Sequence, residues 1–171
     1  MTYGISTSNS SALAHPAAEI TGRVAQLARA FRARNLPVVL VNVAGGAPGR
    51  VDAKFSFTPP ADFAELIPEL DQQPTDLTVT KKRVGAFAGT ALDDLLRQRN
   101  VTQLFFAGIA TSRGVEATAR AAYDQGYNVV TIADAMTDMD IAANTHSIEK
   151  TFPKLSEVTT TEEVLRTLAA T

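Results

Sequence analysis

The sequence predicts an α/β fold, a three-layer αβα sandwich in which helices cover both faces of a mostly parallel sheet. Strand-like apolar runs alternate with segments of helical periodicity throughout the chain. The clearest unit spans residues 101–132, with an apolar strand, a loop of small residues, a helix closed by Gly126 and a second strand. No repeat or second-domain boundary is visible, so residues 1–171 are expected to form one domain.

The first half of the chain contains two helical and two strand-like segments. Residues 17–34 place apolar side chains on one helical stripe, and residues 37–43 form a continuous apolar strand. Residues 44–60 hold three glycines and three prolines, which indicates a long loop of the kind that serves as a lid or interface arm. A short helix is expected over 62–70 and a short strand over 77–80.

The second half repeats the alternation more regularly. Thr160 and Glu163 have the spacing of a capping box, which predicts that the last helix begins there. The expected elements are a helix starting at Thr90, a strand over 101–107, a helix over 115–126, a strand over 127–132, a helix over 141–152, a strand over 155–158 and the final helix.

Composition narrows the function classes. A formal net charge of −2 provides no long-range attraction for nucleic acid or an anionic membrane, so neither partner is expected. No apolar run approaches the roughly 20 residues of a membrane span, and the polar start lacks a signal-peptide core. The chain has no Cys, which excludes disulfides, thiolate metal sites and a cysteine nucleophile. A cytoplasmic protein without a metal or other cofactor is expected.

The predicted ligand site is the loop of residues 108–114. In open α/β sheets, ligands bind at the carboxyl ends of the strands, and this loop follows the strand over 101–107. The helix that comes next could present backbone N–H groups to an anion or a carbonyl oxygen.

At this point the chain resembles the isochorismatase-like hydrolase superfamily, which has a Rossmann-like sheet and includes nicotinamidases and N-carbamoyl amide hydrolases. The resemblance runs from Ala17 to the C-terminus, and its individual motifs are specific only in this order and spacing. They are VTK at 79–81, GAFAGTALD at 85–93, GIATSRGVEATA at 108–119, GY at 126–127 and DA at 134–135.

The resemblance implies an Asp–Lys–Cys catalytic triad of which this chain keeps one member. Lys81 matches the triad lysine and is the predicted catalytic residue. The position of the nucleophilic Cys is held by Gly114, and the metal-binding Asp/His motif of nicotinamidases is absent after Val43. The triad Asp has no match, because the sequence begins just after the strand that carries it, near Tyr3.

In the family that first strand is central in the sheet, so its loss would expose backbone groups on both neighbouring strands. Either another segment takes its place, or residues preceding Met1 do, and we favour the second. Those residues would restore the Asp but not the thiol.

The remaining site residues carry open alternatives. Lys81 is either a pocket residue or a solvated member of the run Lys81-Lys82-Arg83, and Phe87 walls an apolar pocket or packs in the core. Thr111 or Ser112 is expected as a helix N-cap rather than a substitute nucleophile. The predicted substrate-binding residues are Phe87, Ile109, Ala110, Thr111, Ser112, Arg113 and Gly114.

Arg113 stands where a helix N-terminus disfavours a cation, so it binds an anion or points into an interface. The resemblance implies a cis peptide bond between Ile109 and Ala110. His15 and His146 lack metal-ligand spacing, and Asp134 and Asp138 are explained equally well as site carboxylates or turn residues.

Two functions follow. The first is an isochorismatase-family hydrolase-like protein that binds a small molecule at residues 101–126, and by resemblance would cleave a C–N, ether or ester bond without a Cys nucleophile. The second is a catalytically inactive descendant that acts as a small-molecule binding or assembly protein. A homo-oligomer is expected in either case, and the resemblance implies assembly through the helix over 115–126 and the loop over 44–60.

Overall fold

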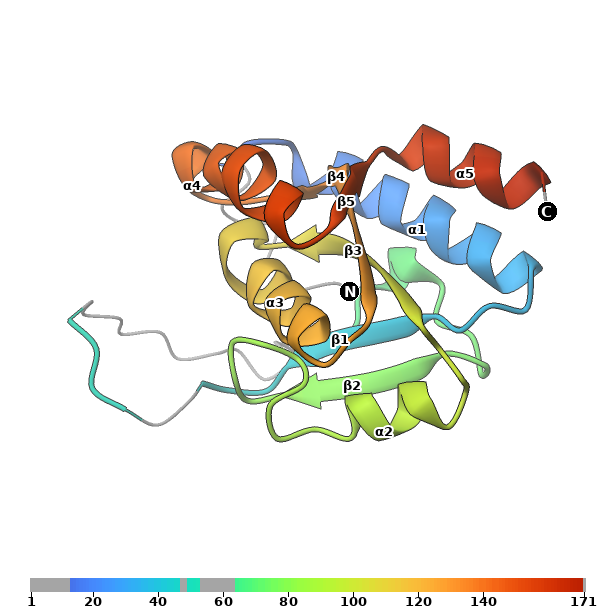
Figure 1. Ribbon diagram of the computed structural model, residues 1–171, viewed down its shortest axis with the longest axis horizontal. Coiled ribbons are helices and arrows are strands. Elements are labelled where there is room, and N and C mark those ends of the chain that lie inside the picture. Colours follow the sequence, from blue (N-terminus) through green and yellow to red (C-terminus); the bar gives the residue numbers. More distant parts are fainter. Residues whose placement is uncertain (1–12, 47–48, 53–63, 171) are drawn as a thin grey trace.

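The computed structural model describes residues 13–46, 49–52 and 64–170, and its strands all pair in parallel (Figure 1). Two strands, β1 (Val39–Val43) and β2 (Leu77–Lys81), form one sheet, with Val41 opposite Val79. A second sheet has the order β3–β4–β5, and its strands are β3 (Gln103–Ile109), β4 (Asn128–Thr137) and β5 (Glu157–Thr159). The predicted parallel α/β architecture is confirmed.

The helices form two outer layers, one on each side of the strands (Figure 1). On one side, α1 (Ala17–Ala33) and α5 (Thr161–Ala170) bury Ile20, Val24 and Val164 against β1, β3 and β4. On the other side, α2 (Leu92–Arg97) and α3 (Glu116–Asp124) bury their apolar faces in a second cluster. Because β-strand side chains alternate between faces, Leu40 joins the first cluster and Val41 the second.

β4 is longer than the sequence pattern predicted, because it contains a large bulge. Phe106 of β3 lies opposite Thr131, but Gly108 lies opposite Met136, so the short step in β3 faces several extra residues in β4. Pairing between the two strands resumes at Met136, and β4 therefore runs on to Thr137. This extension brings Asp138 next to the end of β3.

Two expected helices have different geometry. The helix predicted over 62–70 is wrong where the structure describes it, since only the 3₁₀ turn Pro68–Leu70 is helical. The helix predicted over 141–152 has the expected extent but is composite, with α4 (Ile141–His146), a π-helical turn (Ser147–Thr151) and a 3₁₀ turn (Phe152–Lys154). Part of the loop over 44–60 lies outside the described residues.

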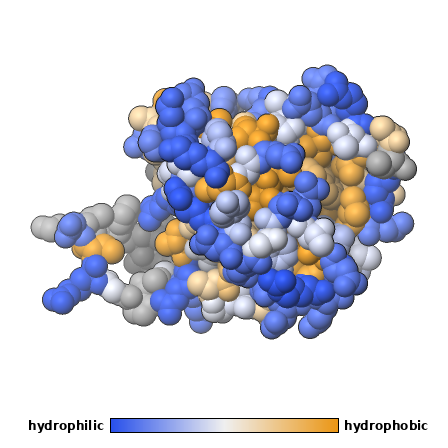
Figure 2. Space-filling view, in the orientation of Figure 1, coloured by the Kyte–Doolittle hydropathy of each residue, from blue (hydrophilic) through white to orange (hydrophobic). Residues whose placement is uncertain are grey.

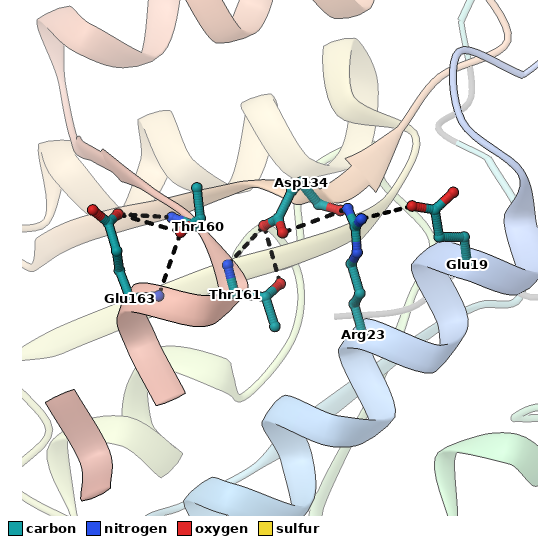
Figure 3. A network of polar contacts seen from close by, with 6 residues as sticks. All are labelled: Glu19, Arg23, Asp134, Thr160, Thr161 and Glu163. Atoms are coloured by element: carbon teal, nitrogen blue, oxygen red, sulfur yellow. Dashed lines mark hydrogen bonds and ion pairs between the residues drawn. The ribbon is translucent and has the colours of Figure 1, made fainter. Parts of the chain in front are cut away.

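The helix expected from Thr90 begins at Leu92, and the strand expected over 155–158 is Glu157–Thr159. Two other sequence signals are confirmed. Thr160 N donates to Glu163 Oε2 at 3.3 Å and Glu163 N donates to Thr160 Oγ1 at 3.4 Å, which is the predicted capping box (Figure 3). Gly126 closes α3 with φ +87°, a left-handed conformation that glycine adopts at little cost. No described helix has both the length and the apolar character needed to cross a membrane.

The two sheets are separate. Among the described residues, β1 pairs only with β2, and β3 pairs only with β4, so each has one unpaired edge.

Candidate functional site

The predicted site loop leaves the end of β3 through an unusual backbone path. Gly108 has φ +124°, and the peptide bond between Ile109 and Ala110 is cis, as the resemblance implied. A π-helical turn (Thr111–Val115) then leads directly into α3. The N–H groups of Arg113 and Val115 both donate to the carbonyl oxygen of Ala110, each at 3.2 Å, and so close this turn.

Thr111 and Ser112 do not cap the helix, so the N-cap prediction was wrong. The buried Thr111 hydroxyl donates to Oδ1 of Asn144 in α4 at 2.7 Å. The Ser112 hydroxyl donates to Oδ2 of Asp138 at 2.7 Å, and Ser112 N donates to the same oxygen at 2.7 Å. These bonds hold the loop to the segments that follow β4.

The two aspartates considered from the sequence have different surroundings. Asp138 is 3% exposed and lies at the loop, where it also accepts from Asp140 N at 3.3 Å. Asp134 instead joins helices α1 and α5 (Figure 3). It accepts from the N and Oγ1 of Thr161 at 2.7 and 3.0 Å and pairs with Arg23 at 3.4 Å. Asp134 thus has an architectural role.

Lys81 ends β2 and is 0% exposed, whereas Lys82 and Arg83 are exposed. The interpretation of Lys81 as one member of a solvated charge run was therefore wrong. Its ammonium group donates to the carbonyl oxygen of Val84. Burial, which disfavours the charged form, lowers the pKa of Lys81 from 10.5 to about 8. A buried, partly neutral amine at a strand end is a chemically distinctive group.

Phe87 packs in the core and also borders a groove. Its ring lies 6.0 Å from the ring of Tyr127, centroid to centroid, and it lines an apolar groove between β1 and β3. The two alternatives for Phe87 therefore coexist, although this groove is not lined by residues of the 108–114 loop.

Gly114 is buried and Arg113 is exposed, so the loop turns the arginine outward. The carbonyl oxygen of Gly114 accepts from Thr118 Oγ1 at 2.6 Å, and that hydroxyl accepts from Ala86 N at 3.0 Å. Thr118 therefore connects the Gly114 loop to the 85–93 motif. One feature of the sequence could have indicated the contact between Thr118 and Gly114. Thr118 lies four residues after Gly114, and residues at this spacing share one face of a helix.

Thr118, Asn144 and Asp138 are the polar neighbours that complete the loop. Sequence reasoning did not assign Thr118 or Asn144, and no periodic pattern marks Asn144. Among the described residues, no group of three or more His, Asp or Glu side chains is placed to hold a metal ion.

The comparisons with known proteins identify the family. Residues 5–163 match the model of the isochorismatase domain. The chain is 34% identical to the uncharacterized isochorismatase family protein YecD of Escherichia coli O157:H7, over 90% of this chain and 86% of YecD. The structure of an isochorismatase family protein from Burkholderia thailandensis has a TM-score of 0.86 and 38% identity, covering 91% of this chain and 85% of that one.

Other relatives match over shorter stretches. The isochorismatase family protein YwoC of Bacillus subtilis is 44% identical over 62% of this chain and 56% of its own length. The ureidoacrylate amidohydrolase RutB of Variovorax paradoxus is 38% identical over 55% of this chain and 39% of its own length. The family match covers nearly the whole described fold and the loop with its cis peptide bond. The chain belongs to the isochorismatase family.

Proposed function

We propose that this chain is a hydrolase-like protein that binds a small molecule over residues 109–114 and does not use a cysteine nucleophile. The observation that supports it best is the buried Lys81, whose amine has a pKa of about 8 in a position that matches the family's triad lysine. In such a site, Lys81 would hold a carboxylate or polarise a carbonyl when protonated, and would accept a proton when neutral.

The substrate class that we propose is a small amide or ureido compound. The likeness to RutB, a ureidoacrylate amidohydrolase, supports this choice. With glycine at position 114, water or a group on the substrate would have to act as the nucleophile. The Ser112 hydroxyl donates to Asp138, and that bond holds it against the segment after β4.

The second function is binding without turnover, either of a small molecule or within an assembly. The absence of Cys favours it, because the family's usual covalent intermediate cannot form on glycine. The tight hydrogen bonding of Thr111 and Ser112 also favours it, since both hydroxyls near Gly114 are already engaged.

A hydrolysis assay separates the two functions. The purified chain is tested on a panel of small amides, ureido compounds and esters, beside Lys81→Ala and the matched control Lys82→Ala, which removes an exposed neighbouring amine. Turnover that falls at least about tenfold in Lys81→Ala but not in Lys82→Ala supports the hydrolase. Turnover that is unchanged in Lys81→Ala removes Lys81 from the mechanism.

Saturable ligand binding without turnover supports the binding protein. We also propose a cytoplasmic homo-oligomer, which light scattering tests directly: a mass that stays at 18.2 kDa across the concentration range would contradict it.

A further inference from the structure

A second groove, with a volume of about 490 Å³, lies between α3 and the composite helix that begins with α4. It is separate from the candidate site, because none of its lining residues belongs to the 108–114 loop or to β2. One wall comes from α3 and the other from the composite helix and its end. The lining residues are Arg120, Tyr123 and Asp124 on the first wall, and His146, Lys150, Thr151, Lys154 and Leu155 on the second.

The spacing of these residues explains why they face one groove. The three residues of α3 are three and four positions apart, so they share one face of that helix. His146, Lys150 and Lys154 follow one another at intervals of four positions along the composite helix, which also keeps side chains on one face. The two helices therefore bring two rows of polar side chains together across the groove.

Positive charge predominates in this groove. Its lining holds three Arg or Lys side chains and one carboxylate, that of Asp124, so two positive charges remain even without His146. The chain as a whole has a formal net charge of −2, which is opposite in sign. Figure 2 shows mainly hydrophilic residues over α4 and α3, whose places are labelled in Figure 1. A concave surface with one sign of charge concentrates ligands of the other sign.

The charges of the groove differ in how they are compensated. Arg120 Nε donates to Oε1 of Glu116 at 2.9 Å, and Glu116 Oε2 accepts from the buried Ser147 hydroxyl at 2.7 Å. The Glu116 carboxylate thus neutralises Arg120 in part and ties α3 to the composite helix. In the described part of the chain, by contrast, neither Lys150 nor Lys154 forms an ion pair. These two ammonium groups are the charges that a ligand can compensate.

The lining also indicates the rest of the ligand. Lys150 and Lys154 lie about one helical turn apart, so together they suit a group with two adjacent negative charges. Tyr123 lines the same groove and is 54% exposed, and its ring offers a surface on which a planar ring can stack. The volume of the groove lies in the range of small-molecule sites.

We propose that this groove binds a small organic anion with a planar ring and two or more adjacent negative charges, the chemistry of a nucleoside diphosphate. The phosphates contact Lys150 and Lys154, and the base stacks on Tyr123. Asp124 offers an acceptor to the ribose hydroxyls. The proposal does not rest on the proposed hydrolase function, because the groove shares no residue with Lys81 or the 109–114 loop.

Isothermal titration calorimetry with ADP, in the absence of divalent metal ions, tests the proposal on the purified 171-residue chain. The groove variant is the double substitution Lys150→Gln with Lys154→Gln. The matched control, Lys82→Gln with Arg83→Gln, removes the same number of exposed cations outside the groove. Pyrophosphate and adenosine are titrated as well, because they carry the charge and the ring separately.

ADP is expected to bind with a dissociation constant below about 1 mM, and the affinity should fall at least about tenfold in the groove variant. The control should change it less than about twofold, since exposed charges at a distance are screened by salt. Tyr123→Ala should weaken ADP at least about fivefold, the effect of losing one stacked base, and leave pyrophosphate unchanged. Adenosine alone should bind more weakly than ADP.

Several results would overturn the proposal. One is the absence of ADP binding below about 1 mM. Another is an ADP affinity that the groove variant leaves unchanged, which would place the anion elsewhere on the chain. Equal losses in the groove variant and the control would show an effect of net charge alone. Light scattering provides the last: if the parent chain binds no ADP and only the groove variant fails to self-associate, a second copy of the chain occupies the groove.

Discussion

The carboxylate of Asp138 accepts two hydrogen bonds from Ser112, one from its backbone N–H and one from its hydroxyl, both to Oδ2 at 2.7 Å. This pair joins the turn after β3 to the residue after β4. Hydrogen bonds to an ionised acceptor are stronger than neutral ones, and Asp138 is almost fully buried. The carboxylate therefore fixes the loop that contains Gly114.

Asp138→Ala is predicted to lower the free energy of unfolding by about 2–3 kcal/mol, because it leaves two donors of Ser112 without their partner. Ser112→Ala removes only the hydroxyl and should cost about 1 kcal/mol. Urea unfolding of both variants measures the difference. As a control, Asp124→Ala changes an exposed carboxylate and should leave stability within about 0.5 kcal/mol. Equal losses in Asp138→Ala and Asp124→Ala would contradict the anchoring role.

The lowered pKa of the buried Lys81 predicts how the free energy of unfolding changes with pH. Its pKa is lowered by burial from 10.5 to about 8, so the folded state binds fewer protons than the unfolded state between these values. Below pH 8 both states are protonated and the folded state bears the full cost of burying the charge, about 3 kcal/mol. Stability should therefore rise as the pH increases from 8 to 10.5, and the contribution of Lys81 to this rise is at most that amount.

Lys81→Met keeps the length of the side chain and removes the charge. It is expected to unfold at a higher temperature than the parent chain at pH 7, with the difference shrinking towards pH 10.5. Lys82→Met, at the exposed neighbouring position, supplies the matched control for any general effect of lost charge. Parallel stability curves for Lys81→Met and the parent across this range would show that the Lys81 amine is not desolvated in the folded protein.

Apolar periodicity was sufficient to predict most of the fold. The stripe in α1, the run in β1 and the capping box before α5 are local signals, and each element formed where they indicated. The helix after β3 was also predicted, but its first turn is π-helical, a geometry that depends on how the loop is held.

Local patterns could not reveal the partners of the site loop. Thr111 contacts a residue 33 positions away and Ser112 one 26 positions away, and both contacts depend on the bulge that extends β4. A bulge changes hydrogen-bond register without changing the apolar pattern, so residues 127–132 indicated a strand but not where it would end. Thr and Ser are typical N-caps, and for this reason the sequence favoured an N-cap at Thr111 or Ser112. That prediction was wrong because both side chains bond to distant residues.

Asp134 is predicted to stabilise the packing of α5 and α1 against β4 (Figure 3). Asp134→Ala removes the acceptor for the N–H and hydroxyl of Thr161, and its ion pair with Arg23, so it should cost about 1–3 kcal/mol in urea unfolding. Glu163→Ala, which removes the exposed half of the capping box on the same helix, should cost less, because that carboxylate is exposed to water. A larger loss in Glu163→Ala than in Asp134→Ala would be inconsistent with this order.

Gly114→Cys tests whether Lys81 and residue 114 share one site. The chain has no other Cys, so the variant carries a single thiol whose alkylation rate against pH reports its pKa. If the Lys81 ammonium lies beside position 114, a thiol there, at the entry to α3, should have a pKa below the usual value of about 8.5. The added substitution Lys81→Met should raise that pKa.

Thr145→Cys places a thiol at an exposed position of α4 and serves as the reference, with an expected pKa of about 8.5. Circular dichroism first establishes that each variant is folded. If the thiol at position 114 has the same pKa as the reference thiol, Lys81 does not act on this position. The same conclusion follows if Lys81→Met leaves the pKa of the thiol at position 114 unchanged. A lowered thiol pKa that depends on Lys81 would show that the loop retains the electrostatic environment of the family's nucleophile although this chain carries glycine there.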